Sequence, residues 1–171
     1  MGRDKAVLPY RGTTLAGYVA REVQAAAGSV MLVGSPERYA RLGYPVIADA
    51  VPPCGPLGGI VTALRQTSAD WNLVIACDMP AVSAAFLKQL LEAAEKSSGL
   101  CLVPMLDPHQ PQPLCAAYHR AALPSLDRAL RDNILKMRDV VELLEPVYWT
   151  VPDFTPFTNI NTPEQWETAR L

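Results

Sequence analysis

The chain has 171 residues, of which 50% are hydrophobic and 19% charged, and its formal net charge is −2 at pH 7. This length fits one domain with a sizeable core, so we expect a single domain over residues 1–171. The charge gives no basic field for nucleic acid or anionic membranes, and no apolar run approaches the roughly 20 residues that a membrane-spanning helix needs.

The cysteines predict reduced thiols rather than a zinc site. Cys54, Cys77, Cys101 and Cys115 have no C-x-x-C spacing, and the two histidines do not pair with them at zinc-site intervals. The N-terminus has no apolar stretch of the kind that follows the charges of a secretory signal. We therefore expect a cytoplasmic protein whose thiols are mostly structural, with Cys77 standing next to an acidic residue.

Helix-period and strand-like segments alternate along the chain. A helix that begins after Thr13 or Thr14 and ends at Gly28 comes first. It is followed by strand 30–33, helical turn 36–42, strand 46–48, helix 57–66, strand 73–76, a helix after Ser83, strands 100–103 and 114–118, helices 124–130 and 137–144, strand 147–151 and a helix after Thr162. This alternation is typical of an α/β layer fold with a mainly parallel sheet. The continuous apolar run at 73–76 predicts a strand that is covered on both faces.

Two acidic residues each follow a predicted strand. Asp49 comes after strand 46–48, and Asp78 comes after strand 73–76. In open α/β sheets ligands bind beyond the carboxyl ends of the strands, and a carboxylate there can hold Mg²⁺ against phosphate oxygens. The alternative is that each residue caps the next turn. We favour metal binding for Asp78 and leave both interpretations open for Asp49.

A breaker-rich loop precedes helix 57–66. It contains Gly55-Pro56-Leu57-Gly58-Gly59, and its backbone N–H groups can approach a base, a ribose or a phosphate. Close packing of the helix would equally explain Gly58 and Gly59. Neither this loop nor Lys5 is specific when it is considered alone, and His109 and His119 have no evident nucleophile as a partner.

Six segments together resemble the molybdenum cofactor guanylyltransferase family, within the Rossmann-like nucleotidyltransferases. In chain order they are Met1-Gly2-Arg3-Asp4-Lys5-Ala6, Ile47-Ala48-Asp49, Gly55-Pro56-Leu57-Gly58-Gly59-Ile60, Cys77-Asp78-Met79-Pro80, Gln112-Pro113-Leu114 and Phe157-Thr158-Asn159-Ile160-Asn161-Thr162-Pro163-Glu164. Each segment is unspecific, but six in family order form a strong signal. The resemblance implies a three-layer Rossmann-like α/β fold, with a mainly parallel sheet and helices on both faces.

The resemblance also implies a reaction. Members of this family transfer GMP from GTP to the terminal phosphate of molybdopterin and release pyrophosphate. By this analogy Asp78 would hold Mg²⁺ near the α-phosphate, Lys5 would offset charge on the triphosphate, and Asp49 would contact the nucleotide or assist the metal. The remaining implied contacts are Gly55, Pro56, Leu57 and Gly58 at the guanine side, and Asn159 and Asn161 at the metal or pterin side. No general base is needed, because the attacking phosphate is already ionised at neutral pH.

The implied partners are GTP, molybdopterin and the proteins that insert the cofactor or receive it, with neither nucleic acid nor membrane among them. The family opens with a strand and a Leu-Ala-Gly-Gly-type loop before the segment that begins here at Met1, so we expect a longer native chain with a further central strand. Gly34 stands where some family members carry Asn. Two alternatives stay open: a related cytidylyl- or other nucleotidyltransferase, and a catalytically weak accessory protein.

Overall fold

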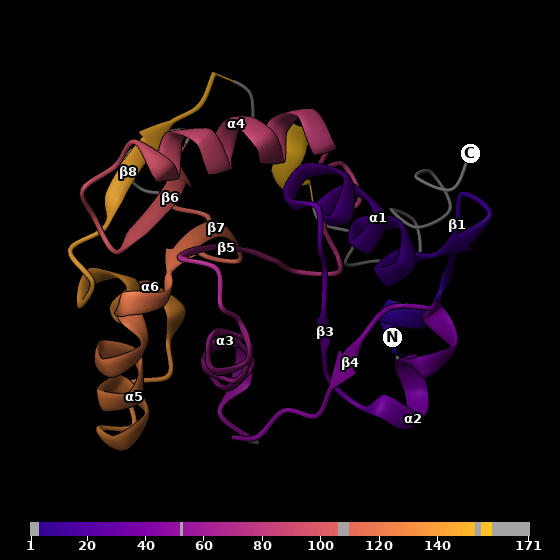
Figure 1. Cartoon of the computed structure of the whole chain (residues 1–171), viewed down its shortest axis with the longest axis horizontal. Helices are drawn as coiled ribbons and strands as arrows, with labels where there is room; N and C mark the ends of the chain where they lie inside the picture. The colour runs from indigo at the N-terminus through magenta and orange to yellow at the C-terminus, as the bar shows by residue number, and fades with distance from the viewer. Residues whose placement is uncertain (1–3, 52, 106–109, 153–154, 159–171) are drawn as a thin grey trace.

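The computed structural model describes residues 4–51, 53–105, 110–152 and 155–158 (Figure 1). Its helices are α1 (Leu15–Ala27), α2 (Pro36–Tyr39), α3 (Gly55–Gln66), α4 (Ala84–Glu95), α5 (Leu123–Arg131) and α6 (Met137–Glu142). Its strands are β1 (Pro9–Tyr10), β2 (Thr13–Thr14), β3 (Leu32–Val33), β4 (Val46–Ile47), β5 (Trp71–Ile75), β6 (Cys101–Met105), β7 (Cys115–His119) and β8 (Val147–Thr150). Four 3₁₀ turns complete the order: η1 (Lys5–Val7), η2 (Ala40–Leu42), η3 (Arg120–Ala122) and η4 (Thr155–Phe157).

A four-stranded sheet with the strand order β5-β7-β6-β8 lies at the centre of the described residues. Strand β7 is antiparallel to β5 and to β6, and β6 is parallel to β8, so three strands run one way and only β7 opposes them. Strands β3 and β4 form a separate parallel pair, and β1 and β2 form a short antiparallel hairpin. The predicted α/β class with a mainly parallel sheet is confirmed.

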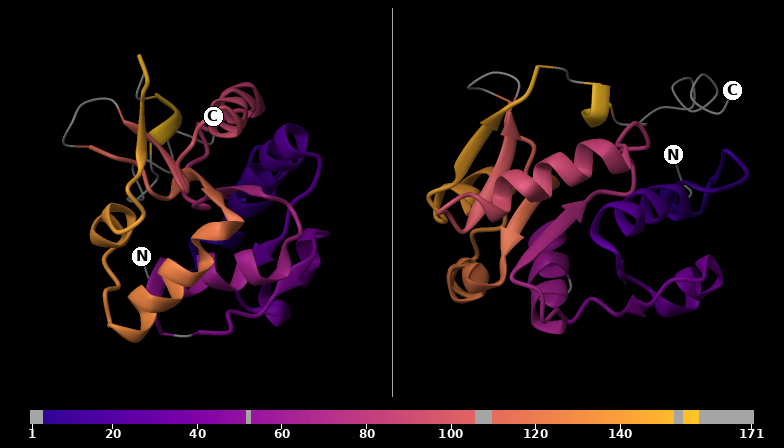
Figure 2. Two further views of the ribbon diagram at one scale, coloured as in Figure 1. Left: turned by 60° about the vertical axis from the view of Figure 1, so that its left-hand side comes forward. Right: turned by 45° about the horizontal axis from the view of Figure 1, so that its top comes forward.

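Helices cover both faces of this sheet, because successive side chains of a strand point to opposite faces. On β6, Cys101 and Val103 join the core formed with α3, α5 and α6, whereas Leu102 joins the core formed with α1 and α4. The β7 residues divide between the same two cores in the same alternating way. Figure 2 shows the two groups of helices on either side of the strands, which confirms the predicted three layers.

The helix caps that the sequence predicts are present. The Thr14 hydroxyl accepts a hydrogen bond from the Gly17 amide at the start of α1, and Gly28 ends that helix with a φ of +77°. Ser83 caps α4 in the same way, through the Phe86 amide. Because a cap satisfies backbone groups that the helix itself leaves unpaired, these ends could be predicted from local sequence.

Several predicted bounds shift by one or two residues, and one expectation about burial is wrong. Helix α3 begins at Gly55, two residues before its predicted start, since Gly55 adopts a φ of +60° and Pro56 fits the first turn. Strand β5 was expected to be covered on both faces, but all five of its residues are only half-buried. Among the described strands β5 pairs with β7 alone, so its other edge has no hydrogen-bonded neighbour there.

Two expectations drawn from the composition can also be compared with the structure. In the described part of the chain, no helix combines the length and the apolar character needed to cross a membrane. All four cysteines are free thiols, and Cys101 and Cys115 are fully buried, as structural cysteines would be.

Candidate functional site

Lys5 and Asp78 come together from distant parts of the sequence. Lys5 begins the short turn η1, and Asp78 lies three residues beyond the end of β5. The Lys5 ammonium nitrogen lies 3.9 Å from the Asp78 carboxylate oxygen Oδ2, and the two side chains are 32% and 26% exposed. The structure therefore places a cation and an anion at one partly exposed position beyond the carboxyl end of β5, where open α/β sheets bind ligands.

The pKa of the Cys77 thiol depends on the charges around Lys5 and Asp78. Burial, together with the carboxylates of Asp78 and Asp4, raises the pKa of Cys77 to about 11, while a backbone hydrogen bond and Lys5 oppose the rise. A thiol with this pKa stays protonated at neutral pH and is a poor nucleophile. The interpretation of Cys77 as a small structural residue beside an acidic site is supported.

The turn that carries Lys5 is shaped by the residue before it. Asp4 is the N-cap of η1, and its Oδ1 accepts a hydrogen bond of 3.1 Å from the Ala6 amide. The Leu8 amide closes the turn by donating to the Lys5 carbonyl at 3.1 Å. Lys5 is therefore held by local backbone hydrogen bonds, although it lies near the beginning of the sequence.

Asp49 is engaged mainly with its own loop. Its Oδ1 accepts hydrogen bonds from the Val51 amide at 3.0 Å and from the Thr62 hydroxyl at 3.2 Å. The Thr62 oxygen in turn accepts from the Ala50 amide at 3.1 Å. Of the two interpretations left open for Asp49, the structure shows the capping one directly, and nucleotide contact stays a prediction.

The four residues predicted at the guanine side form the first turn of α3. Leu57 is fully buried in the core, so its side chain packs there rather than against a ligand. At Gly58 an added Cβ would lie 2.7 Å from the Val51 carbonyl oxygen and 3.3 Å from Asp49 Oδ1. Close packing of the Asp49 loop on α3 therefore explains Gly58.

Thr62 is the residue that the sequence analysis missed. Apart from tyrosines and cysteines, it is the one polar or charged side chain that is buried in the described core, at 3% exposure, and it ties α3 to the Asp49 loop. The available signal was a hydroxyl at four-residue spacing from Gly58, on the apolar face of the helix.

His119 ends β7, and its Nδ1 accepts a hydrogen bond from the Ala121 amide, as expected for a strand-end residue. Asn159, Asn161 and His109 lie outside the described residues.

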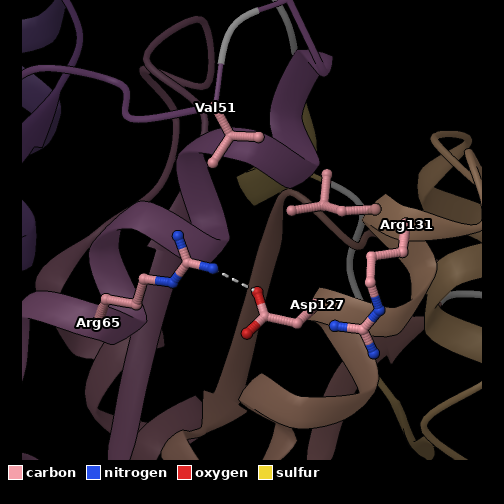
Figure 3. Close-up of a pocket in the computed structure, with 5 residues that line it drawn as sticks. Val51, Arg65, Asp127 and Arg131 are labelled. Carbon is pink, nitrogen blue, oxygen red and sulfur yellow. Dashed lines mark hydrogen bonds and ion pairs between the residues drawn. The ribbon is translucent and has the colours of Figure 1, made fainter.

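A separate hollow lies between α3 and α5 and contains none of the predicted residues. Its lining residues include Val51, Arg65, Asp127 and Arg131 (Figure 3). Arg65 donates to Asp127 across it at 2.7 Å, and Arg131 extends from α5 beside that pair. The ion pair engages two of its polar side chains, and none of the six matched motifs lines it, so this hollow is a weaker candidate than the position of Lys5 and Asp78.

The carboxylate of Asp78 fits the way in which proteins bind Mg²⁺. Among the described residues no group of three His, Cys, Asp or Glu side chains could enclose a metal ion. Mg²⁺ is commonly held by one or two carboxylates together with water and substrate phosphates, so a lone partly exposed carboxylate is adequate. The Asp78 side chain is 26% exposed, so its carboxylate is accessible from solvent.

The sequence profile of the MobA-like NTP transferase domain matches residues 1–147. The chain belongs to the MobA-like NTP transferase family. It is 32% identical over 163 residues to a probable molybdenum cofactor guanylyltransferase of Deinococcus radiodurans, covering 95% of this chain and 83% of that protein. It is 27% identical over 170 residues to the molybdenum cofactor guanylyltransferase of Vibrio atlanticus, covering 96% and 85%.

Solved structures agree with this membership of the MobA-like family. Molybdopterin-guanine dinucleotide biosynthesis protein A from Archaeoglobus fulgidus superposes with a TM-score of 0.83 at 28% identity, over 99% of this chain and 90% of that one. The 2-C-methyl-D-erythritol 4-phosphate cytidylyltransferase of Thermus thermophilus superposes with a TM-score of 0.74 at 20% identity, which shows the fold alone. The resemblance drawn from the sequence motifs is confirmed.

Proposed function

We propose that this protein transfers GMP from GTP to the terminal phosphate of molybdopterin, with release of pyrophosphate. The observation that carries the proposal is the approach of Lys5 and Asp78, because this reaction needs both a cation and a metal-binding carboxylate beside the triphosphate. Further support comes from relatives named molybdenum cofactor guanylyltransferase that align over nearly the whole chain. The proposed partners are GTP and molybdopterin, and the free thiols favour a cytoplasmic location.

In the proposed reaction an oxygen of the acceptor phosphate attacks the α-phosphorus of GTP, while the bond from that phosphorus to the bridging oxygen of pyrophosphate breaks. Lys5 offsets negative charge on the triphosphate as the pyrophosphate leaves. Asp78 holds Mg²⁺, which supplies charge neutralisation at the phosphate oxygens when it is bound. At the exposed start of α3, Gly55 offers its backbone N–H group to the nucleotide, whereas Pro56 has no N–H group and shapes the turn.

The test measures pyrophosphate release with Mg²⁺, molybdopterin and each of GTP, CTP and ATP in turn. We expect release with GTP and a loss of about 100-fold or more in the variants Lys5→Ala and Asp78→Asn, since each removes charge stabilisation at the phosphates. Lys88→Ala is the matched control, because Lys88 is exposed on α4 and should leave the rate unchanged. Release with CTP in place of GTP would favour a cytidylyltransferase. No release with any nucleotide would leave the accessory function.

A further inference from the structure

The carboxylate that shapes the Lys5 turn also binds a residue from a distant helix. While Asp4 Oδ1 caps η1, Asp4 Oδ2 accepts a hydrogen bond of 2.8 Å from the Tyr39 hydroxyl, 35 residues away in the sequence. Tyr39 is the last residue of α2, so the two oxygens of one carboxylate join the Lys5 turn to that helix. A neutral hydroxyl donating to a carboxylate at this distance is a strong, charge-assisted hydrogen bond.

The ring of Tyr39 can reach Asp4 only because residue 34 has no side chain. A Cβ built on Gly34 would lie 2.5 Å from Tyr39 Cε2, closer than real Cβ contacts allow. Tyr39 is half-buried, and burial together with the Asp4 hydrogen bond raises the pKa of its hydroxyl to about 12. The hydroxyl therefore stays a proton donor throughout the pH range in which such an enzyme would work.

The neighbouring arginine contributes less to holding Asp4. Arg38 lies 3.6 Å from Asp4 Oδ2, but its side chain is 68% exposed, and exposed ion pairs of this kind are worth little. The defined contact between α2 and the Lys5 turn is thus the hydrogen bond from Tyr39.

We propose that Tyr39 is a positioning residue, which acts through Asp4 to hold the Lys5 turn at the distance from Asp78 that nucleotidyl transfer requires. The kinetic consequence rests on the proposed function, whereas the structural tether does not. A turn that is free to shift would keep Lys5 near the phosphates yet place its charge less accurately in the transition state. Tyr39 itself contacts neither substrate nor metal.

The kinetic test compares Tyr39→Phe with Tyr44→Phe in the pyrophosphate-release assay. Tyr44 is also a half-buried residue, and no hydrogen bond of its hydroxyl is found within the described residues, so removal of that hydroxyl is a matched control. We expect Tyr39→Phe to lower kcat about tenfold while KM for GTP changes less than about twofold, and Tyr44→Phe to change neither. In the Lys5→Ala background the effect of Tyr39→Phe should disappear, because the residue acts through Lys5. Equal loss in both backgrounds would indicate general destabilisation and overturn the proposal.

A second readout needs no activity and separates this inference from the proposed function. Amide hydrogen exchange is measured by NMR at Ala6 and Leu8, whose N–H groups are bonded within the Lys5 turn. We expect exchange at both amides to be about tenfold faster in Tyr39→Phe than in the wild-type protein and in Tyr44→Phe. Unchanged exchange would refute the tether even if the enzyme proved active. Faster exchange in a protein without transferase activity would retain the tether and reject the proposed reaction.

Discussion

A methyl group added at Gly58 tests the packing of the Asp49 loop on α3. In the variant Gly58→Ala the new Cβ would lie 2.7 Å from the Val51 carbonyl oxygen and 3.3–3.4 Å from the two Asp49 carboxylate oxygens. The Val51 carbonyl cannot turn away cheaply, because it accepts a hydrogen bond from the Cys54 amide while its own amide donates to Asp49. The loop must therefore move away from the helix as a unit, by about half an ångström or more.

The expected magnitude is the difference between two opposing effects. Forcing a methyl group into a closely packed position costs about 1–3 kcal/mol, whereas replacing glycine by alanine within a helix contributes up to about 1 kcal/mol of stability. With the full helix gain subtracted, Gly58→Ala should lower the free energy of unfolding by up to about 2 kcal/mol. Gly59→Ala is the matched control in the same helix, because its Cβ would meet only Val33 Cγ1, at an ordinary 3.8 Å. It should leave stability unchanged or raise it by about 0.4–1 kcal/mol.

The assay is equilibrium unfolding in urea, followed by circular dichroism, with the three proteins compared at equal slope of the transition. A lower midpoint for Gly58→Ala alone is the expected result. Equal midpoints for the two alanine variants would mean that the loop adjusts without cost. The close packing over Gly58 would then not be the reason for a glycine there, and contact with a nucleotide would become the better explanation.

Three further predictions use the same unfolding assay. Thr62→Val should lower the free energy of unfolding by about 1–3 kcal/mol, because the Ala50 amide and Asp49 lose their buried hydrogen-bond partner. Thr62→Ser keeps the hydroxyl and should retain most of the stability. Equal losses in the two variants would contradict this role of the hydroxyl. Burial raises the pKa of Cys101 and of Cys115 to about 12, from 9.0. These thiols ionise more readily in the unfolded chain, so their contribution to stability should be constant below about pH 9 and be lost between about pH 9 and 12, a loss that Cys→Ala variants should reduce. Thr14→Ala should lower the free energy of unfolding by about 1 kcal/mol, because the Gly17 amide loses the hydroxyl that caps α1. An unchanged free energy of unfolding would refute the capping role of Thr14.

Much of the fold could be predicted from local sequence, because local interactions decide where elements begin and end. Thr14 and Ser83 cap helices through amides three residues ahead, and Gly28 ends α1 in a conformation that glycine adopts without strain. The α/β alternation and the mainly parallel sheet followed from apolar periodicity. The half-exposed state of β5 did not, since exposure depends on which strands lie beside it rather than on its own residues.

The candidate site, like the fold, could be predicted only in part from local sequence. Asp78 could be predicted because it is the acidic residue that follows strand 73–76, and Lys5 because it lies in the motif at the N-terminal end of the sequence. No local pattern, however, relates two residues so far apart in the sequence. Their separation of 3.9 Å is a product of tertiary folding, which brings the Lys5 turn to the end of β5. Likewise the sequence left two explanations for Gly58, contact with a ligand and close packing of the helix. The Val51 carbonyl oxygen, 2.7 Å from where a Cβ would lie, supports the packing explanation.

The sequence by itself determined the class of fold, the family and the identity of the charged residues, because these depend on residue types, periodicity and motif order. Only the tertiary structure showed that Asp49 is bound by Thr62, and that Tyr39 reaches Asp4 across the space left by Gly34. The physical reason is that a side chain's hydrogen-bond partner is set by distance in space, which sequence separation does not record.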